Sequence, residues 1–187
     1  MQEPSDLRAH PGQRVAELVG HLGKSEVVAW CADLVAGATA YDDPSGPSLA
    51  WLGGRHALVL LEQGDLEASG NAYWPRVWGA RGLLYAYEPA AAPQVVGALH
   101  DGAWRVREMA AKVVARWEVA DAADALGPLL DDGVTRVRAA AVRALGVVGE
   151  GEHADAVRGA GEDPEPSVRR AAATALAALR ARLDRDL

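Results

Sequence analysis

The chain has 187 residues, half of them hydrophobic, which suits one domain or a short repeat array and argues against disorder of the whole chain. Alanine makes up about a fifth of the residues and phenylalanine is absent, which favours close-packed helices over an all-β sandwich. The net charge of -7 and the pI of about 5.2 argue against the broad basic surface of non-specific nucleic-acid or membrane binders. The single cysteine, Cys31, excludes an intramolecular disulfide and a multi-cysteine metal site.

The start of the chain carries no helical or strand pattern, so we expect residues 1–12 to form a flexible tail. It shows no charged and apolar leader, and no uninterrupted apolar run of about 20 residues occurs along the chain. The sequence therefore predicts a soluble, cytoplasmic protein that makes no contact with a membrane.

Residues 13–91 are expected to form divergent helical hairpins. Apolar residues at helical spacing predict helices over residues 13–22 and 25–36, the second with Ser25 as its N-cap. Residues 39–47 are predicted to be a loop, and residues 48–63 a further helix. Cys31 lies on an apolar stripe, with no neighbour in the sequence that would lower its pKa, so we expect it in the core.

A pattern that recurs at equal intervals fills the second half of the chain. Each copy has an aspartate, a valine five positions later and an arginine six positions later; the aspartates are Asp101, Asp132 and Asp163 and the arginines are Arg107, Arg138 and Arg169. From each valine an apolar stripe at helical spacing predicts a helix with one buried face. Shorter helical stretches at 93–99, 122–130 and 153–160 precede the aspartates, so each copy is predicted to be a helical hairpin with the aspartate at its turn.

An earlier, divergent copy aligns Val77 with Val106, at an interval slightly shorter than that between the regular copies. In this copy Trp78 replaces the repeated arginine and Ala72 replaces the aspartate. Arg81 occupies a position that is alanine in the other copies, so the role of this copy in the array differs from theirs.

The pattern of Asp, Val-Arg and an Ala-rich helix over residues 92–182 resembles the HEAT repeat, and more narrowly the short bacterial HEAT-like units. The resemblance implies an all-α, right-handed α-solenoid, a superhelix of about five stacked hairpins, whose second helices line the inner face. It also implies a ladder of ion pairs between neighbouring repeats, made by Asp101, Asp132 and Asp163 with Arg107, Arg138 and Arg169. Because a lone hairpin cannot bury both of its apolar stripes, we expect residues 92–187 to be the regular array with a C-terminal cap.

Tryptophans and arginines are the candidates for binding a partner. Arg76, Arg105 and Arg136 each precede a stripe valine and form either a solvated face or a ridge of cations for an acidic partner segment. Tryptophan with arginine is the composition of an interaction hot spot, although these tryptophans could instead cover the junction with the divergent copies. The partner-binding candidates are Trp74, Arg76, Trp78, Arg81, Trp104, Arg105 and Arg136, whereas Trp30, Trp51 and Trp117 lie on or near apolar stripes and are predicted to be core residues.

Catalytic motifs are absent from the sequence. The five histidines are scattered, and no His-Glu pair recurs from copy to copy as it does in the HEAT-like di-iron hydroxylases. Neither a zinc-protease motif, a nucleotide-binding glycine loop nor a G-x-S-x-G nucleophile motif occurs. We therefore predict no catalytic residue, no metal ligand and no cofactor.

The favoured function is a non-catalytic repeat scaffold that binds a protein partner on the face formed by the second helices. The alternative is a DNA-binding enzyme resembling the HEAT-like alkylpurine DNA glycosylases, in which an aspartate, tryptophans and a basic groove embrace a lesion. The acidic net charge makes nucleic acid the less favoured ligand. However, residues 1–93 hold 11 acidic and 6 basic residues and residues 94–187 hold 15 and 13, so the regular array is nearly balanced and leaves room for a local basic face.

Overall fold

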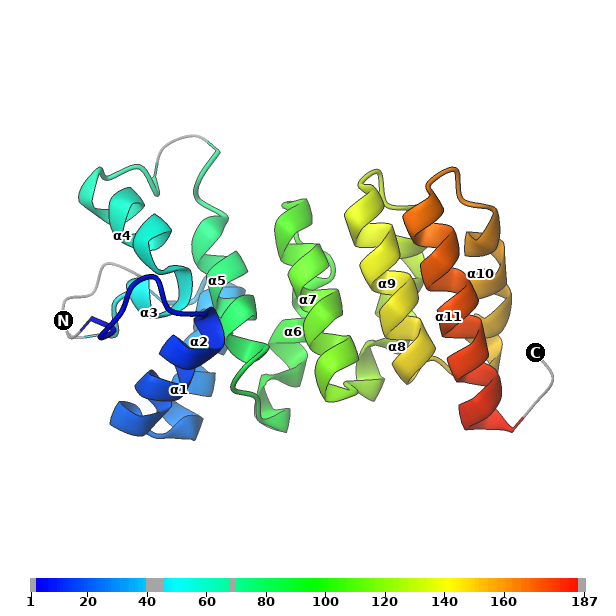
Figure 1. The fold of residues 1–187 in the computed structure, drawn as a ribbon, viewed down its shortest axis with the longest axis horizontal. Coiled ribbons are helices and arrows are strands. Elements are labelled where there is room, and N and C mark those ends of the chain that lie inside the picture. The colour runs from blue at the N-terminus through cyan, green and yellow to red at the C-terminus, as the bar shows by residue number, and fades with distance from the viewer. Residues whose placement is uncertain (1–2, 40–45, 68–69, 185–187) are drawn as a thin grey trace. The chain divides into compact units, whose positions relative to one another are not determined.

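The computed structural model describes residues 3–39, 46–67 and 70–184, and every regular element in these ranges is a helix (Figure 1). The chain divides into two compact units, Met1–Gln94 and Val95–Leu187, which we call the N-terminal and the C-terminal unit. None of the described helices combines the length and the apolar character needed to cross a bilayer.

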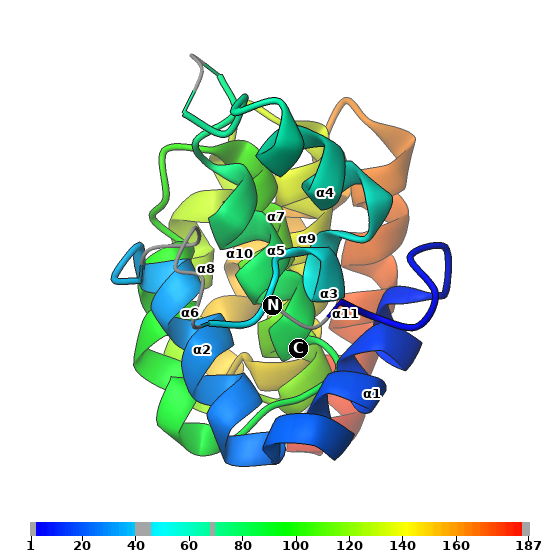
Figure 2. The same ribbon diagram turned by 90° about the vertical axis from the view of Figure 1, so that its left-hand side faces the viewer.

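The N-terminal unit is built around α5. Its helices are α1 (Pro11–Leu22), α2 (Lys24–Ala36), α3 (Ala50–Gly53), α4 (Arg55–Glu62) and α5 (Trp74–Leu83). Figure 2 shows α5 between α2 and α3, and α5 contacts both of them. A 3-10 turn, η1 (Pro89–Ala91), follows, and α6 (Ala92–Ala98) lies at the division between the units.

Among the described residues before α1, Ser5 contacts that helix. The backbone N–H and the hydroxyl of Ser5 donate to the Glu17 carboxylate at 3.1 and 2.9 Å, which ties the segment expected to be a flexible tail to α1. Helix α1 begins at Pro11 because proline is favoured in the first turn and Nδ1 of His10 accepts the N–H of Gly12.

Two predicted features of the N-terminal unit are wrong. Ser25 is not an N-cap: α2 starts after Gly23, and the Ser25 hydroxyl donates instead to Glu88 at 3.0 Å. The single helix expected over residues 48–63 is divided into α3 and α4, because Gly54 has a φ of 61°, outside the helical region. The loop expected over residues 39–47 falls mostly on residues 40–45, which lie outside the described residues.

Two glycines of α5 allow it to approach α2 closely. A Cβ on Gly82 would collide with Sγ of Cys31, and one on Gly79 would lie 2.7 Å from the Cys31 carbonyl oxygen. Cys31 is fully buried, as expected, and burial raises its pKa to about 12, so its thiol is a packing group of the core.

The C-terminal unit repeats one hairpin. Its long second helices are α7 (Trp104–Trp117), α9 (Thr135–Val148) and α11 (Pro166–Leu183), and α9 packs between the other two (Figure 1). The stripe valines Val106, Val137 and Val168 are fully buried, as predicted. At the contact of α9 with α11, a Cβ on Gly146 would lie 2.7 Å from Cα of Ala175, so a glycine is needed there.

The first segments of these hairpins are less regular than predicted. One helix is expected over residues 122–130, but the segment consists of α8 (Ala123–Leu126) between the 3-10 turns η2 (Ala120–Ala122) and η3 (Gly127–Asp131). Similarly, α10 (Ala154–Gly159) lies between η4 (Gly151–His153) and η5 (Ala160–Glu162). Pro128 lacks the N–H that an α-helix would use at this point, which explains the interruption after α8.

Substitution of Gly82 by alanine tests the contact between α2 and α5. We expect Gly82→Ala to lower the free energy of unfolding by about 1–3 kcal/mol, because the added methyl group overpacks the site. Gly20→Ala is the control: Gly20 is exposed on α1 with no atom near an added Cβ, so the better helix former should raise stability by about 1 kcal/mol. Urea unfolding measures both, and a Gly82→Ala protein as stable as the wild type would contradict the account.

Candidate functional site

In the first two regular repeats an arginine reaches the hairpin turn of the next repeat. Nε and Nη2 of Arg107 both lie 2.7 Å from Oδ2 of Asp132, and Nη1 donates to the carbonyl of Asp101 in its own turn at 2.7 Å. Arg138 contacts Asp163 in the same way, with Nε to Oδ2 at 2.7 Å and Nη2 to Oδ1 at 3.1 Å. Each arginine therefore joins two consecutive turns.

The aspartates of this ladder also hold the turn that precedes each second helix. Oδ1 of Asp101, Asp132 and Asp163 accepts the backbone N–H two residues later, at 2.7 to 2.8 Å. The hydrogen bond from Arg138 lowers the pKa of Asp163, and the same bond raises the pKa of Arg138. Arg169 ends the row and, within the described part of the chain, donates to the carbonyls of Asp163 and Pro164.

With the turns held in register, residues of adjacent second helices meet around Trp104. The guanidinium carbon of Arg105 lies 4.3 Å from the centroid of the half-buried Trp104 ring, and that of Arg136, from the next repeat, lies at 5.5 Å. Both distances are within the range of cation–π attraction. The structure thus brings together three of the predicted binding residues of the C-terminal unit.

Glu108 and Lys112 complete this group, which we call the Trp104 cluster: Trp104, Arg105, Glu108, Lys112 and Arg136. Glu108 is 6% exposed, and its Oε1 lies 2.7 Å from Nζ of Lys112 and 3.1 Å from Nη2 of Arg136. Sequence reasoning missed Glu108 and Lys112. The spacing of four positions from Trp104 to Glu108 and on to Lys112 places all three on one side of α7 and was the available signal.

The Trp104 cluster belongs to a larger positively charged surface of the C-terminal unit. We define the basic face as six cations of the second helices that do not belong to the ladder: Arg105, Lys112, Arg116, Arg136, Arg143 and Arg170. Four of them, Arg116, Arg136, Arg143 and Arg170, are exposed, and the side chain of Arg136 is 66% exposed. Glu108 is the single acidic residue on α7, α9 and α11, all of whose residues are described.

The family of the chain follows from comparison with known proteins. The family model for HEAT repeats matches residues 67–146 and 124–187, more than half of the chain. The chain belongs to the HEAT-repeat family. The first match begins before Trp74 and therefore includes the divergent copy around Val77. A search of curated proteins gives no match.

Trp78 takes the place of the ladder arginine in this divergent HEAT repeat, and its burial does not fit the partner-binding role predicted for it. Its side chain is 0% exposed and stacks on Trp74 with 5.5 Å between ring centroids, while His56 meets both rings edge-on. The indole fits because Gly53 has no side chain: a Cβ there would lie 2.7 Å from Cε2 of Trp78. Trp78 is thus a core residue of the N-terminal unit.

The other candidates of the N-terminal unit are less buried than Trp78. Trp74 and Arg76 are half-buried, and Arg76 donates to the Ala72 carbonyl at 3.3 Å. Arg81 is half-buried, and burial lowers its pKa; its charge also contributes, after burial, to the lowered pKa of Arg14. Arg14 is itself buried and donates to the carbonyls of four residues, Leu7, Ala9, Trp51 and Leu52. Arg81 is thus partly withdrawn from the surface of this unit.

Of the three tryptophans predicted to lie in the core, Trp51 is 1% exposed, whereas Trp30 and Trp117 are half-buried. The guanidinium of Arg116 lies over the Trp117 ring at 5.2 Å, which covers part of that ring.

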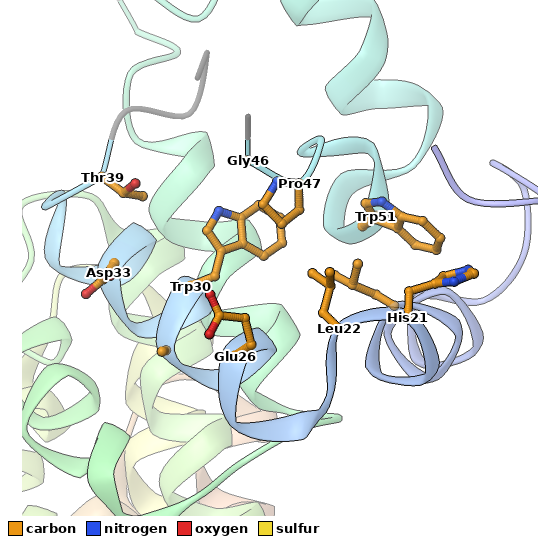
Figure 3. Close-up of a pocket in the computed structure, with 11 residues that line it drawn as sticks. His21, Leu22, Glu26, Trp30, Asp33, Thr39, Gly46, Pro47 and Trp51 are labelled. Carbon is orange, nitrogen blue, oxygen red and sulfur yellow. The ribbon is translucent and has the colours of Figure 1, made fainter. Parts of the chain in front are cut away.

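Trp30 borders a hollow of about 550 Å³ in the N-terminal unit (Figure 3). His21 and Leu22 of α1, Trp30 of α2 and Trp51 of α3 form its apolar and aromatic walls, and Glu26 and Asp33 add carboxylates. Residues 40–45, which lie between rim residues Thr39 and Gly46, are outside the described part of the chain, and we assign the hollow no ligand.

Asp124, Glu152 and His153 bring three potential metal-ligand atoms within 4.8 Å of one another. Nδ1 of His153 accepts the N–H of Glu150 at 3.0 Å, which places the proton of the neutral ring on Nε2. Nε2 lies 3.3 Å from the Asp124 carboxylate, so the arrangement favours a hydrogen bond over metal ligation.

Neutralising Arg138 tests the ladder. We expect Arg138→Gln to lower the free energy of unfolding by about 2 kcal/mol at neutral pH, because the shielded Asp163 carboxylate loses a charged donor. Asp163 has a lowered pKa, so its contribution is complete above the ordinary value of 3.8 and is lost as the pH falls through the lower folded value. The deficit of Arg138→Gln should therefore shrink as the solution is acidified.

Arg169→Gln is the control for this measurement, because Arg169 is exposed and its described hydrogen bonds go to backbone carbonyls. It should cost less than about 1 kcal/mol and change the pH profile of stability less than Arg138→Gln does, because Arg169 is the smallest of the influences that lower the pKa of Asp163. Equal losses for the two variants in urea unfolding would show that the pairing with Asp163 does not stabilise the array.

Proposed function

We propose that this HEAT-repeat protein is a non-catalytic scaffold that binds a protein partner through the second helices of its C-terminal unit. The observation that carries the proposal is the basic face, a group of cations on an otherwise acidic chain with the Trp104 cluster within it. Tryptophan and arginine are the residue types that contribute most to the binding energy of protein interfaces.

The contacts within the Trp104 cluster prepare it for binding. Arg105 and Arg136 lie against one ring, and Arg136 is also held by Glu108, so Arg136 loses little side-chain freedom when a partner arrives. Trp104 is half-buried, and it can therefore offer part of its ring to a partner while the rest packs against its neighbours.

The alternative, a DNA-binding enzyme, gains support from the positive charge of the basic face but lacks a catalytic group on it. Glu108 is the single acidic residue on the described helices α7, α9 and α11, and its Oε1 is held by Lys112 and Arg136. These ion pairs account for the position of Glu108, and the described residues of the three helices offer no second carboxylate for a catalytic role. The scaffold is therefore the better-supported function.

A selection from a library of random peptides displayed on phage tests the proposal. We expect the wild-type protein to enrich peptides that bind the double variant Trp104→Ala, Arg105→Glu at least about tenfold more weakly. The variant should keep the circular dichroism and the melting temperature of the wild type to within a few degrees, since neither side chain is fully buried.

Arg158→Glu provides the matched control, because it makes the same charge change on the exposed surface of α10, away from the basic face. Selected peptides should bind it as they bind the wild type. Peptides that bind the double variant and the wild type equally would place the binding surface elsewhere and overturn the proposal.

A further inference from the structure

Charge is divided sharply between the parts of the C-terminal unit. The second helices α7, α9 and α11 carry eleven basic residues and one acidic residue, whereas the rest of residues 95–187 carries fourteen acidic and two basic residues. The ladder accounts for only three of the eleven, Arg107, Arg138 and Arg169. The numbers of acidic and basic residues in the whole unit are nearly equal, but the second helices are strongly positive and the rest of the unit is acidic.

The basic face already holds one carboxylate. Oε1 of Glu108 lies within 3.1 Å of donors from Lys112 on its own helix and from Arg136 on the next. Cations from neighbouring repeats can thus converge on a single carboxylate. Arg143 stands one repeat after Lys112 and is exposed, but no acidic residue of α9 stands beside it.

Apolar positions alternate with these cations. Met109, at helical spacing from Arg105, and Val147, at helical spacing from Arg143, are half-buried. Ala178, at helical spacing from Arg170, is exposed. A surface that binds only a phosphate backbone gains little from such residues, whereas a polypeptide can place apolar side chains on them between its carboxylates.

Acidic residues border the basic face at both ends of its helices. The ladder aspartates lie at the N-terminal ends, and Glu118 and Glu150 follow the C-terminal ends of α7 and α9. From Arg105 to Arg116 the positive strip is about 16 Å long at the helical rise per residue. A long polyanion that extends past the strip at the C-terminal end of α7 meets the carboxylate of Glu118, whereas a single peptide segment that runs across the helices stays within the strip.

From this arrangement we infer that the basic face binds an acidic polypeptide segment, rich in aspartate and glutamate with apolar residues between them. The inference rests on the proposed function and names the chemistry of the partner. Carboxylates of the segment pair with Arg105, Arg136 and Arg143, and Glu108 competes with them for Arg136 and Lys112. The charge of Glu108 therefore limits the affinity.

The test is fluorescence anisotropy of the full chain with four labelled probes. They are a short peptide of aspartate, glutamate and leucine, the same peptide with asparagine and glutamine for the acids, a single-stranded oligodeoxynucleotide and its duplex. We expect the acidic peptide to bind most tightly and to lose affinity as salt is added, because added ions screen the attraction.

Variants that are expected to change the affinity in opposite directions make the test specific. Arg136→Glu with Arg143→Glu should weaken binding of the acidic peptide by at least about tenfold, and Arg158→Glu should leave it within about twofold of the wild type. Glu108→Gln keeps the shape of the side chain and removes its charge, so it should strengthen binding several-fold. A merely structural role for Glu108 would not produce this gain.

The outcomes separate the inference from the proposed function. If the neutral peptide binds as well as the acidic one and the face variants weaken both, the scaffold proposal stands and the acidic partner is wrong. Tighter binding of either oligonucleotide would overturn the acidic partner in favour of nucleic acid. If no peptide binds in a way that the face variants change, both proposals fail.

Discussion

The pairing of an arginine in one repeat with the turn aspartate of the next is the contact on which the array depends. Arg107 with Asp132 and Arg138 with Asp163 each join two turns, while the same aspartates accept the N–H of the residue directly before the second helix. A shielded, hydrogen-bonded ion pair fixes geometry more firmly than an exposed one. The ladder thus sets the register in which α7, α9 and α11 lie side by side.

Because the second helices lie in register, residues that repeat in the sequence form one continuous surface. Positions one repeat apart fall at equivalent places on neighbouring helices, which is how Arg136 reaches Trp104 and Glu108 of the preceding repeat. The ladder also holds three arginines at the turns, and six of the other eight cations on these helices are exposed. Close contacts at alanine and glycine, such as Gly146 against Ala175, keep the helices near enough for this pairing.

The sequence predicted the features that repeat along the chain, but it did not predict those that depend on contacts between residues far apart in the sequence. The equal spacing of Asp101, Asp132 and Asp163 was sufficient for the family, the all-helical fold and the buried valines, because each is repeated and local. The burial of Trp78 depends on Gly53, and the break at Gly54 on a positive φ, neither of which a periodic pattern reports. In the site, the arginines around Trp104 were predicted, but Glu108 was not, because its partner Arg136 belongs to the next repeat.

The central claim, that the basic face is the binding surface and that its ligand is acidic, is tested most directly by amide chemical-shift mapping. The ¹⁵N-labelled protein is titrated with the peptide of aspartate, glutamate and leucine. We expect the largest shifts on α7 and α9, around Arg105, Lys112, Arg136 and Arg143. Shifts concentrated on α8, α10 or the N-terminal unit, or no saturable shifts at all, would contradict it.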